Sequence, residues 1–300
     1  MLVAVVLVVI AVGTVVFHVV SPWWWTPIAS NWHIIDDATL VTFWITGVAY
    51  VAVILFMAYC AVRFRYRKGR RAAYEPENKR LEWWLTGLTS LGVIGLLTPG
   101  LIVWNEFVTV PDDAAEFEVV GRQWQWSYRL PGKDGVLGAS DPRLITGDNT
   151  FGLDPNDPRG QDDVLIEGDD LHLPIGRPLK VLMRSADVIH DFYVPHFRAK
   201  MDIIPGMVTY FWFTPTRTGT FDILCAELCG VGHHTMRGMV VVEADTDYQE
   251  WLQGQSTFAD LMARAAPGDA VKLAADEGRG DAAANGNTRS GSDRPSPINR

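Results

Sequence analysis

Three long apolar stretches occupy the first third of the chain. They cover residues 2–20, about 40–62 and about 83–104, and the first contains no charged residue. A helix needs about 20 apolar residues to cross the hydrocarbon core of a bilayer, so each stretch is long enough to span a membrane. The sequence therefore predicts a membrane-anchored protein.

The connection between the second and third stretches is strongly basic over residues 63–71. Loops rich in Lys and Arg stay in the cytoplasm, so these stretches should form a helical hairpin, residues 35–107, that opens outward. Everything after about residue 106 should then lie on the outer face. We expect a multi-pass protein of the cell (inner) membrane with its second domain in the periplasm.

The first apolar stretch allows two interpretations. Residues 1–34 could be a cleaved signal peptide or an extra membrane span, followed by an aromatic linker. The stretch has no basic region before it and is long for the hydrophobic region of a signal peptide. It ends at Ser21-Pro-Trp-Trp-Trp25, which is typical of an interfacial aromatic belt. We favour a retained span, and both alternatives give the same orientation.

The pattern changes to short β-rich segments from about residue 116. Strands of this length, separated by Gly and Pro turns, predict an all-β sandwich over residues 108–245. Within it, residues 131–170 form a polar stretch that we expect to be a long loop. A short helix over residues 246–265 and a disordered tail over residues 266–300 should follow. The net charge of −9 argues against nucleic acid and favours a basic partner.

Two thiols, an imidazole and a thioether lie close together near the end of this domain, at Cys225, Cys229, His233 and Met236. A structural disulfide, possible outside the cell, explains only the cysteines. A zinc site leaves the methionine idle, and a mononuclear blue-copper site leaves one cysteine over. A binuclear copper centre, bridged by two thiolates, uses every soft donor.

A binuclear centre needs a second imidazole from elsewhere in the chain. His190 is the best candidate, because it follows the expected strand at residues 179–183 and precedes a turn before a proline. His172 and His196 are weaker candidates with poorer strand signals around them. His234 should be a polar surface residue.

The Cys-x-Glu-x-Cys-x-x-x-His-x-x-Met segment, preceded by Asp187-Val-x-His, resembles subunit II of cytochrome c oxidase, a heme–copper oxidase. The resemblance covers about residues 35–245 and implies a cupredoxin-like β-sandwich. It also implies a binuclear copper-A centre, in which Glu227 contributes its backbone carbonyl. By the same resemblance, the Glu227 carboxylate reaches a magnesium ion shared with the catalytic subunit. The implied metal-binding residues are His190, Cys225, Glu227, Cys229, His233 and Met236.

Two further segments resemble this family. In Gly121-Arg-Gln-Trp-Gln-Trp, the leading Trp124 corresponds to the residue through which electrons enter from cytochrome c. This chain has Gln125 where the family commonly has Tyr. Residues 78–82 resemble the segment before the family's second helix, in which Glu82 would mark the entrance of a proton path. Glu82 can equally be an ordinary carboxylate at a helix start.

The resemblance implies the electron-accepting subunit of a proton-translocating cytochrome c oxidase, with oxygen reduced in a heme-bearing subunit I. Its partners would be that subunit, further oxidase subunits, cytochrome c and membrane lipid. The chain has no Cys-x-x-Cys-His segment, so the donor heme must belong to another protein. Two alternatives stay open: the copper-A subunit of a nitric oxide reductase, and a membrane copper-binding protein without electron transfer.

Overall fold

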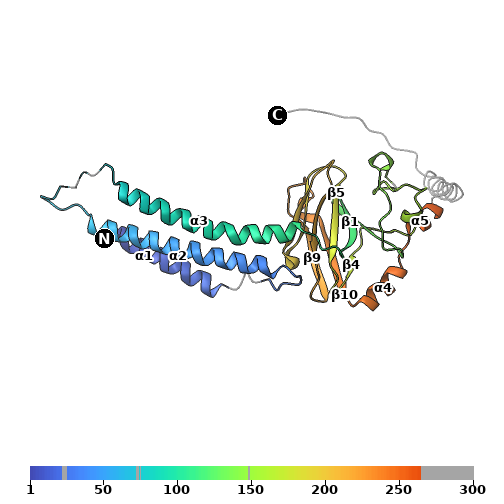
Figure 1. The fold of residues 1–300 in the computed structure, drawn as a ribbon, viewed down its shortest axis with the longest axis horizontal. Helices are drawn as coiled ribbons and strands as arrows, with labels where there is room; N and C mark the ends of the chain where they lie inside the picture. The colour runs from blue at the N-terminus through green and yellow to red at the C-terminus, as the bar shows by residue number, and fades with distance from the viewer. Residues whose placement is uncertain (22–25, 72–73, 75, 148, 265–300) are drawn as a thin grey trace, which may run out of the picture.

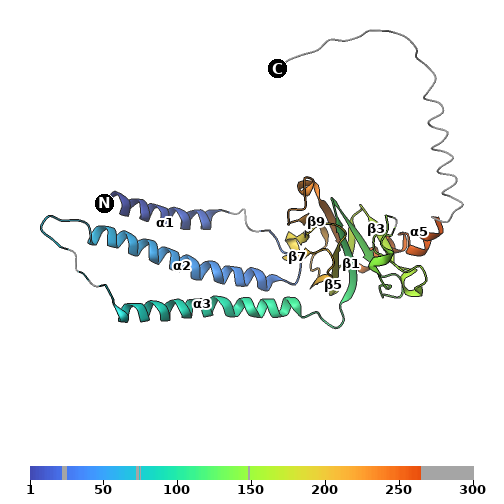
Figure 2. The same ribbon diagram turned by 90° about the horizontal axis from the view of Figure 1, so that it is seen from above.

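The computed structural model describes residues 1–21, 26–71, 74, 76–147 and 149–264. Three helices, α1 (Leu2–Val20), α2 (His33–Arg63) and α3 (Lys79–Val108), run side by side and lead to a β-domain at one end (Figures 1 and 2). All three are long and apolar enough to cross a membrane. The predicted aromatic belt at residues 23–25 lies outside the described residues.

Helices α2 and α3 are longer than the apolar stretches from which they were predicted. Helix α2 begins at His33, before the expected start near residue 40, and α3 begins at Lys79, where Asn78 Oδ1 accepts from Leu81 N at 3.0 Å. The added turns carry polar groups, which fits helix ends that emerge from a bilayer. The N-terminus and the basic α2–α3 connection both lie at the end away from the β-domain (Figure 1).

The β-domain is a sandwich of two five-stranded sheets. One sheet has the order β3-β2-β1-β5-β8 and the other β4-β10-β9-β6-β7. The expectation of a membrane-anchored β-sandwich is therefore confirmed. The strands are β1 (Ala115–Arg122), β2 (Gln125–Leu130), β3 (Val164–Glu167), β4 (Leu171–Pro174), β5 (Leu179–Ser185), β6 (His190–Val194), β7 (Ala199–Ile203), β8 (Thr209–Phe213), β9 (Gly219–Cys225) and β10 (Arg237–Glu243).

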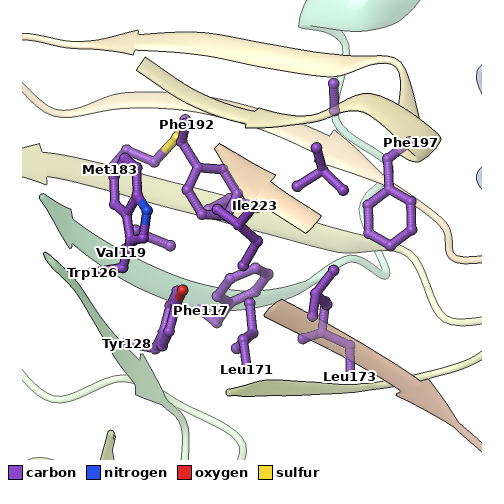
Figure 3. Close-up of a cluster of buried hydrophobic side chains, with 14 of the residues drawn as sticks. Phe117, Val119, Trp126, Tyr128, Leu171, Leu173, Met183, Phe192, Phe197 and Ile223 are labelled. Atoms are coloured by element: carbon purple, nitrogen blue, oxygen red, sulfur yellow. The ribbon is translucent and has the colours of Figure 1, made fainter. Parts of the chain in front are cut away.

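Aromatic side chains from both sheets fill the core between them. Phe117 and Val119 point inward from β1, Trp126 from β2 and Phe192 from β6 (Figure 3), and all four are almost fully buried. Alternate residues of a strand face one side of a sheet, so this period-two pattern directs one row of side chains into the core. Burying each large side chain contributes about 1.5–3 kcal/mol.

We expected the polar stretch at residues 131–170 to be a long loop, but part of it is regular structure. It contains strand β3 and two short 3-10 turns, η1 (Pro142–Leu144) and η2 (Pro158–Gly160). Phe151 and Leu153 are buried with Val120 and with Phe258, so the stretch covers the outer face of the first sheet. Few hydrophobic residues among many Asp and Gly concealed this second small core.

The expected helix over residues 246–265 is two helices, α4 (Asp245–Gln253) and α5 (Phe258–Arg264). The break follows Gly254, and α5 is anchored where Phe258 N donates to the carbonyl oxygen of Asp163 at 2.8 Å. The expected disordered tail at residues 266–300 lies outside the described residues.

A candidate metal centre at one end of the sandwich

The soft donors converge at one end of the second sheet. Cys225 is the last residue of β9, and Met236 directly precedes β10, so the hairpin between these strands carries the cysteine loop. His190 begins β6, which pairs with β9 through the Phe192–Cys225 register. Strand pairing therefore brings residue 190 beside a loop that follows it by more than 30 positions in the chain.

The donor atoms form two matching halves around the two sulfurs. Cys225 Sγ lies 3.6 Å from Cys229 Sγ, 3.9 Å from His190 Nδ1 and 3.2 Å from the Glu227 carbonyl oxygen. Cys229 Sγ lies 3.6 Å from His233 Nδ1 and 3.8 Å from Met236 Sδ. Each sulfur thus has one imidazole nitrogen and one weaker donor beside it.

A hydrogen bond fixes the orientation of the buried His190 ring. Its Nε2 lies 2.8 Å from Asp187 Oδ1, so Nδ1 faces the sulfurs. Asp187 Oδ2 accepts from Gln123 N at 2.7 Å. Although burial opposes the shift, these hydrogen bonds hold the pKa of Asp187 below its usual value. A charged carboxylate that is hydrogen-bonded to the far nitrogen of a metal-binding histidine orients the ring and raises its basicity.

Burial of the thiols disfavours the bare thiolate, so ionisation here would need a bound cation. Cys229 is only 2% exposed, and its burial together with the nearby Cys225 raises the pKa of its thiol. Metals bind the deprotonated thiolate, and the positive charge of a metal would offset this cost. Two thiolates, two imidazoles and a thioether form a donor set suited to copper, which accepts soft ligands.

Trp124 lies against the outside of this centre. Its indole Nε1 donates to the Cys229 carbonyl oxygen at 3.3 Å, and Gln123 Nε2 donates to the same oxygen at 2.8 Å. The ring packs on Gly232, where an added Cβ would lie 2.3 Å from Trp124 Cδ2. Trp124 is 37% exposed, whereas Trp126 is a buried core residue whose ring lies at 64° to the ring of His190.

Sequence reasoning missed the role of Gln123. Its backbone N–H reaches Asp187 and its side chain reaches Cys229, so it joins the Trp124 segment to both halves of the centre. No residue pattern indicates this, because it depends on the way the β1–β2 turn folds over the loop.

The structure places the other sequence candidates elsewhere. Glu82 is in the first turn of α3, at the far end of the helices from the centre. His172 pairs with Glu243 and stacks on Trp251, and His196 packs against Phe221. His234 is exposed, and within the described residues no hydrogen bond or ring contact joins it to the donor atoms. The Glu227 side chain is also exposed, although its carbonyl faces Cys225.

Comparison with known proteins points to one family. The sequence profile of the cytochrome c oxidase subunit II periplasmic domain matches residues 116–244. The chain is 64% identical over 264 residues to alternative cytochrome c oxidase subunit 2 of Bradyrhizobium diazoefficiens, covering 88% of this chain and 95% of that protein. It is 28% identical to cytochrome c oxidase subunit 2 of Cereibacter sphaeroides, covering 76% and 77%.

A solved structure is also similar. The crystal structure of the periplasmic domain of subunit II of cytochrome oxidase from Bradyrhizobium japonicum is 28% identical to the matching part of the chain. It covers 48% of this chain and 95% of that domain, with a TM-score of 0.35.

Proposed function

The chain belongs to the cytochrome c oxidase subunit II family, and on that premise we propose that it accepts electrons from cytochrome c at a binuclear copper centre. The electrons then pass to heme in a catalytic subunit I, which reduces oxygen and translocates protons. The observation that carries this proposal is the paired donor set around Cys225 and Cys229, in which every soft side chain has a place.

When bound, the copper pair would supply one-electron transfer. The residues present can hold it: His190, Cys225 and the Glu227 carbonyl on one side, and Cys229, His233 and Met236 on the other. Because the sheets fix β6, β9 and β10, the ligands can change little when an electron arrives or leaves. The buried, hydrogen-bonded surroundings of His190 would tune the potential of the centre.

Trp124 is the residue through which we expect electrons to enter. It combines a partly exposed aromatic ring with a hydrogen bond to the backbone carbonyl oxygen of Cys229, so one residue joins the surface to the backbone of a proposed copper ligand. Gly230 and Gly232 lie against the Trp124 ring, and the absence of a Cβ at both leaves room for it.

The surface beside Trp124 suits a basic donor protein. Antiparallel pairing of Ser127 with Glu167 places the turn after β3 at the same end of the sheet as the Trp124 turn. Acidic residues stand at the last position of β3, Glu167, and in the turn after it, at Asp169 and Asp170. Charge of this sign accelerates the encounter with a basic cytochrome c and fixes its orientation.

Several finer features belong to the same proposal. The exposed Glu227 carboxylate would help to hold a magnesium ion between this chain and the catalytic subunit, and Glu82 would mark the start of a proton path on the opposite side of the membrane.

We place the helices, residues 35–107 and the first span, in the cell (inner) membrane and the sandwich, residues 108–245, in the periplasm. Further oxidase subunits and membrane lipid would complete the surroundings.

The experiment is to purify the oxidase from membranes, with its copper, and to record its electron spin resonance spectrum. An electron shared equally by two copper nuclei gives a seven-line pattern, whereas a single copper gives four lines. Stopped-flow mixing with reduced cytochrome c should bleach the copper absorbance before heme is reduced. A four-line spectrum, or heme reduction without the copper step, would contradict the proposal. Oxygen and nitric oxide uptake by the same sample identify the substrate of the catalytic subunit.

A further inference from the structure

The linker between α1 and α2 is built into the sandwich. Ala29 N donates to the His196 carbonyl oxygen at 2.7 Å, and Ser30 Oγ donates to the Phe197 carbonyl oxygen at 2.7 Å. Trp32, just before α2, is 1% exposed in the main core. The start of a membrane helix is thus fixed directly to the β-domain.

Arg198 closes this junction from the side of the sandwich. Its Nε and Nη2 donate to Asp36 Oδ1 and Oδ2 at 2.6 and 2.9 Å, which makes a bidentate ion pair with the first turn of α2. Nη1 donates to the Pro195 carbonyl oxygen at 2.8 Å, and Nη2 donates to the Thr26 carbonyl oxygen at 2.6 Å. One guanidinium therefore joins α2, the linker and the β6–β7 connection.

The backbone of Arg198 is in an unusual conformation. Its φ of 55° and ψ of 20° are left-handed, and it is the one non-glycine residue with a positive φ in the described parts of the chain. A residue with a Cβ is sterically disfavoured in the left-handed region, which glycine adopts readily. Such a conformation persists where the surrounding contacts over-determine it, as the contacts of the guanidinium do here.

The junction is mechanically connected to the copper site. Strand β6 begins at His190, and the short 3-10 turn η3 (Pro195–Phe197) follows its last residue and leads to Arg198. Strand β7 then returns along β6, with Val194 opposite Ala199 and His190 opposite Ile203. The junction and the copper ligand are therefore opposite ends of one hairpin, about 13 Å apart at strand rise.

We propose that the Arg198–Asp36 pair is a positioning device that sets the place of the copper centre relative to the membrane helices. The inference rests on the proposed function, because the helices also locate the chain on the catalytic subunit. The pair touches neither the donor atoms nor Trp124. Its loss should therefore slow the electron's departure to heme, while the arrival from cytochrome c and the copper spectrum stay unchanged.

The test uses the complete purified oxidase with Arg198→Gly, which suits the backbone, and Asp36→Asn, which keeps an oxygen for Arg198. Flash reduction of bound cytochrome c resolves the two rates. We expect the copper-to-heme rate to fall by roughly tenfold in Arg198→Gly and by less in Asp36→Asn, in line with the loss of charge-assisted hydrogen bonds. Arg177→Gln, which removes a half-exposed ion pair with Asp245, is the control and should change neither rate.

A copper-to-heme rate equal to that of the wild type in both variants would overturn the inference. So would a parallel fall of both rates with an altered copper spectrum, because that indicates general loss of structure. If Arg198→Gly does not assemble, Asp36→Asn decides, and Arg198→Lys should recover part of the rate. A wild-type oxidase without the binuclear copper signal would instead refute the proposed function.

Discussion

The Sγ atoms of Cys225 and Cys229 lie 3.6 Å apart, and both thiols are free. A disulfide requires a separation of about 2.05 Å. The two sulfurs instead face the same space, into which His190 and His233 also direct a nitrogen each. In this structure the loop has the form of a ligand-binding site, and the disulfide considered from the sequence is not formed.

Replacing either sulfur should destroy the centre. Cys225→Ser and Cys229→Ser each put a hard hydroxyl where a shared thiolate is needed, so we expect the seven-line copper signal to disappear and bound copper to fall. His234→Ala is the control, since this exposed neighbour of His233 should leave the signal intact. Metal analysis and electron spin resonance of the purified oxidase measure both effects. A seven-line signal that survives in either serine variant would be inconsistent with bridging thiolates.

Neutralising the carboxylate behind His190 should weaken copper binding. Asp187→Asn keeps the shape of the side chain but loses the charge that orients the ring through Nε2. Changes to such supporting groups typically lower metal affinity about 10–100-fold, and chelator competition would measure this. Asp169→Asn, on the exposed turn after β3, should leave copper affinity unchanged. Equal affinities in the wild type and Asp187→Asn would show that the hydrogen bond is dispensable.

The sequence was enough for the three long apolar helices and for the β-sandwich class, because both follow from local patterns of apolar residues, whereas strand β3 was hidden in the polar stretch at residues 131–170. The grouping of the donor residues was also recoverable, since five of the six lie in the segment from Cys225 to Met236 and only His190 had to be found elsewhere. The contact of Gln123 with Asp187 was not, because it joins two turns that are distant in the chain. Nor was the break between α4 and α5, which depends on the anchoring of Phe258 to the covering stretch.

Adding one methyl group beneath Trp124 should slow reduction by cytochrome c. The Cβ of Gly232→Ala would lie 2.3 Å from the indole, so the ring must move away from the Cys229 carbonyl. We expect a slower copper reduction with full copper content, as for Trp124→Phe, which removes the indole N–H. Gly147→Ala, where a Cβ meets nothing within 4 Å, is the matched control. Unchanged stopped-flow rates in both site variants would argue that electrons enter elsewhere.

A buried cluster of charges lies between the first sheet and the stretch that covers it. Arg129 is 2.8 Å from Glu118 and 3.2 Å from Asp163, and Gly138 N donates to Asp163 at 3.0 Å. Arg184 also pairs with Glu118. Burial raises the pKa of Asp163 to about 7, although Arg129 and the Gly138 N–H oppose the shift. The protonation of Asp163 should therefore be linked to stability near neutral pH.

Asp163→Asn should remove the contribution of this carboxyl to the pH dependence of stability, as measured in a soluble fragment of residues 109–264. An unfolded Asp titrates near pH 4, whereas folded Asp163 keeps its proton up to about pH 7. Between these values the folded state binds more protons, so the free energy of unfolding falls as pH rises, by at most about 1.4 kcal/mol per pH unit from this group. In denaturant titrations, the free energy of unfolding of Asp163→Asn should therefore rise relative to that of the wild type between pH 5 and pH 8. Asp157→Asn should show no such trend over this range, because hydrogen bonds from Ala139 N and Arg159 N lower the pKa of Asp157, and its carboxyl is therefore ionised in both the folded and the unfolded state above pH 5. A difference between Asp163→Asn and wild type that is constant with pH would mean that the Asp163 carboxyl is already ionised throughout this range.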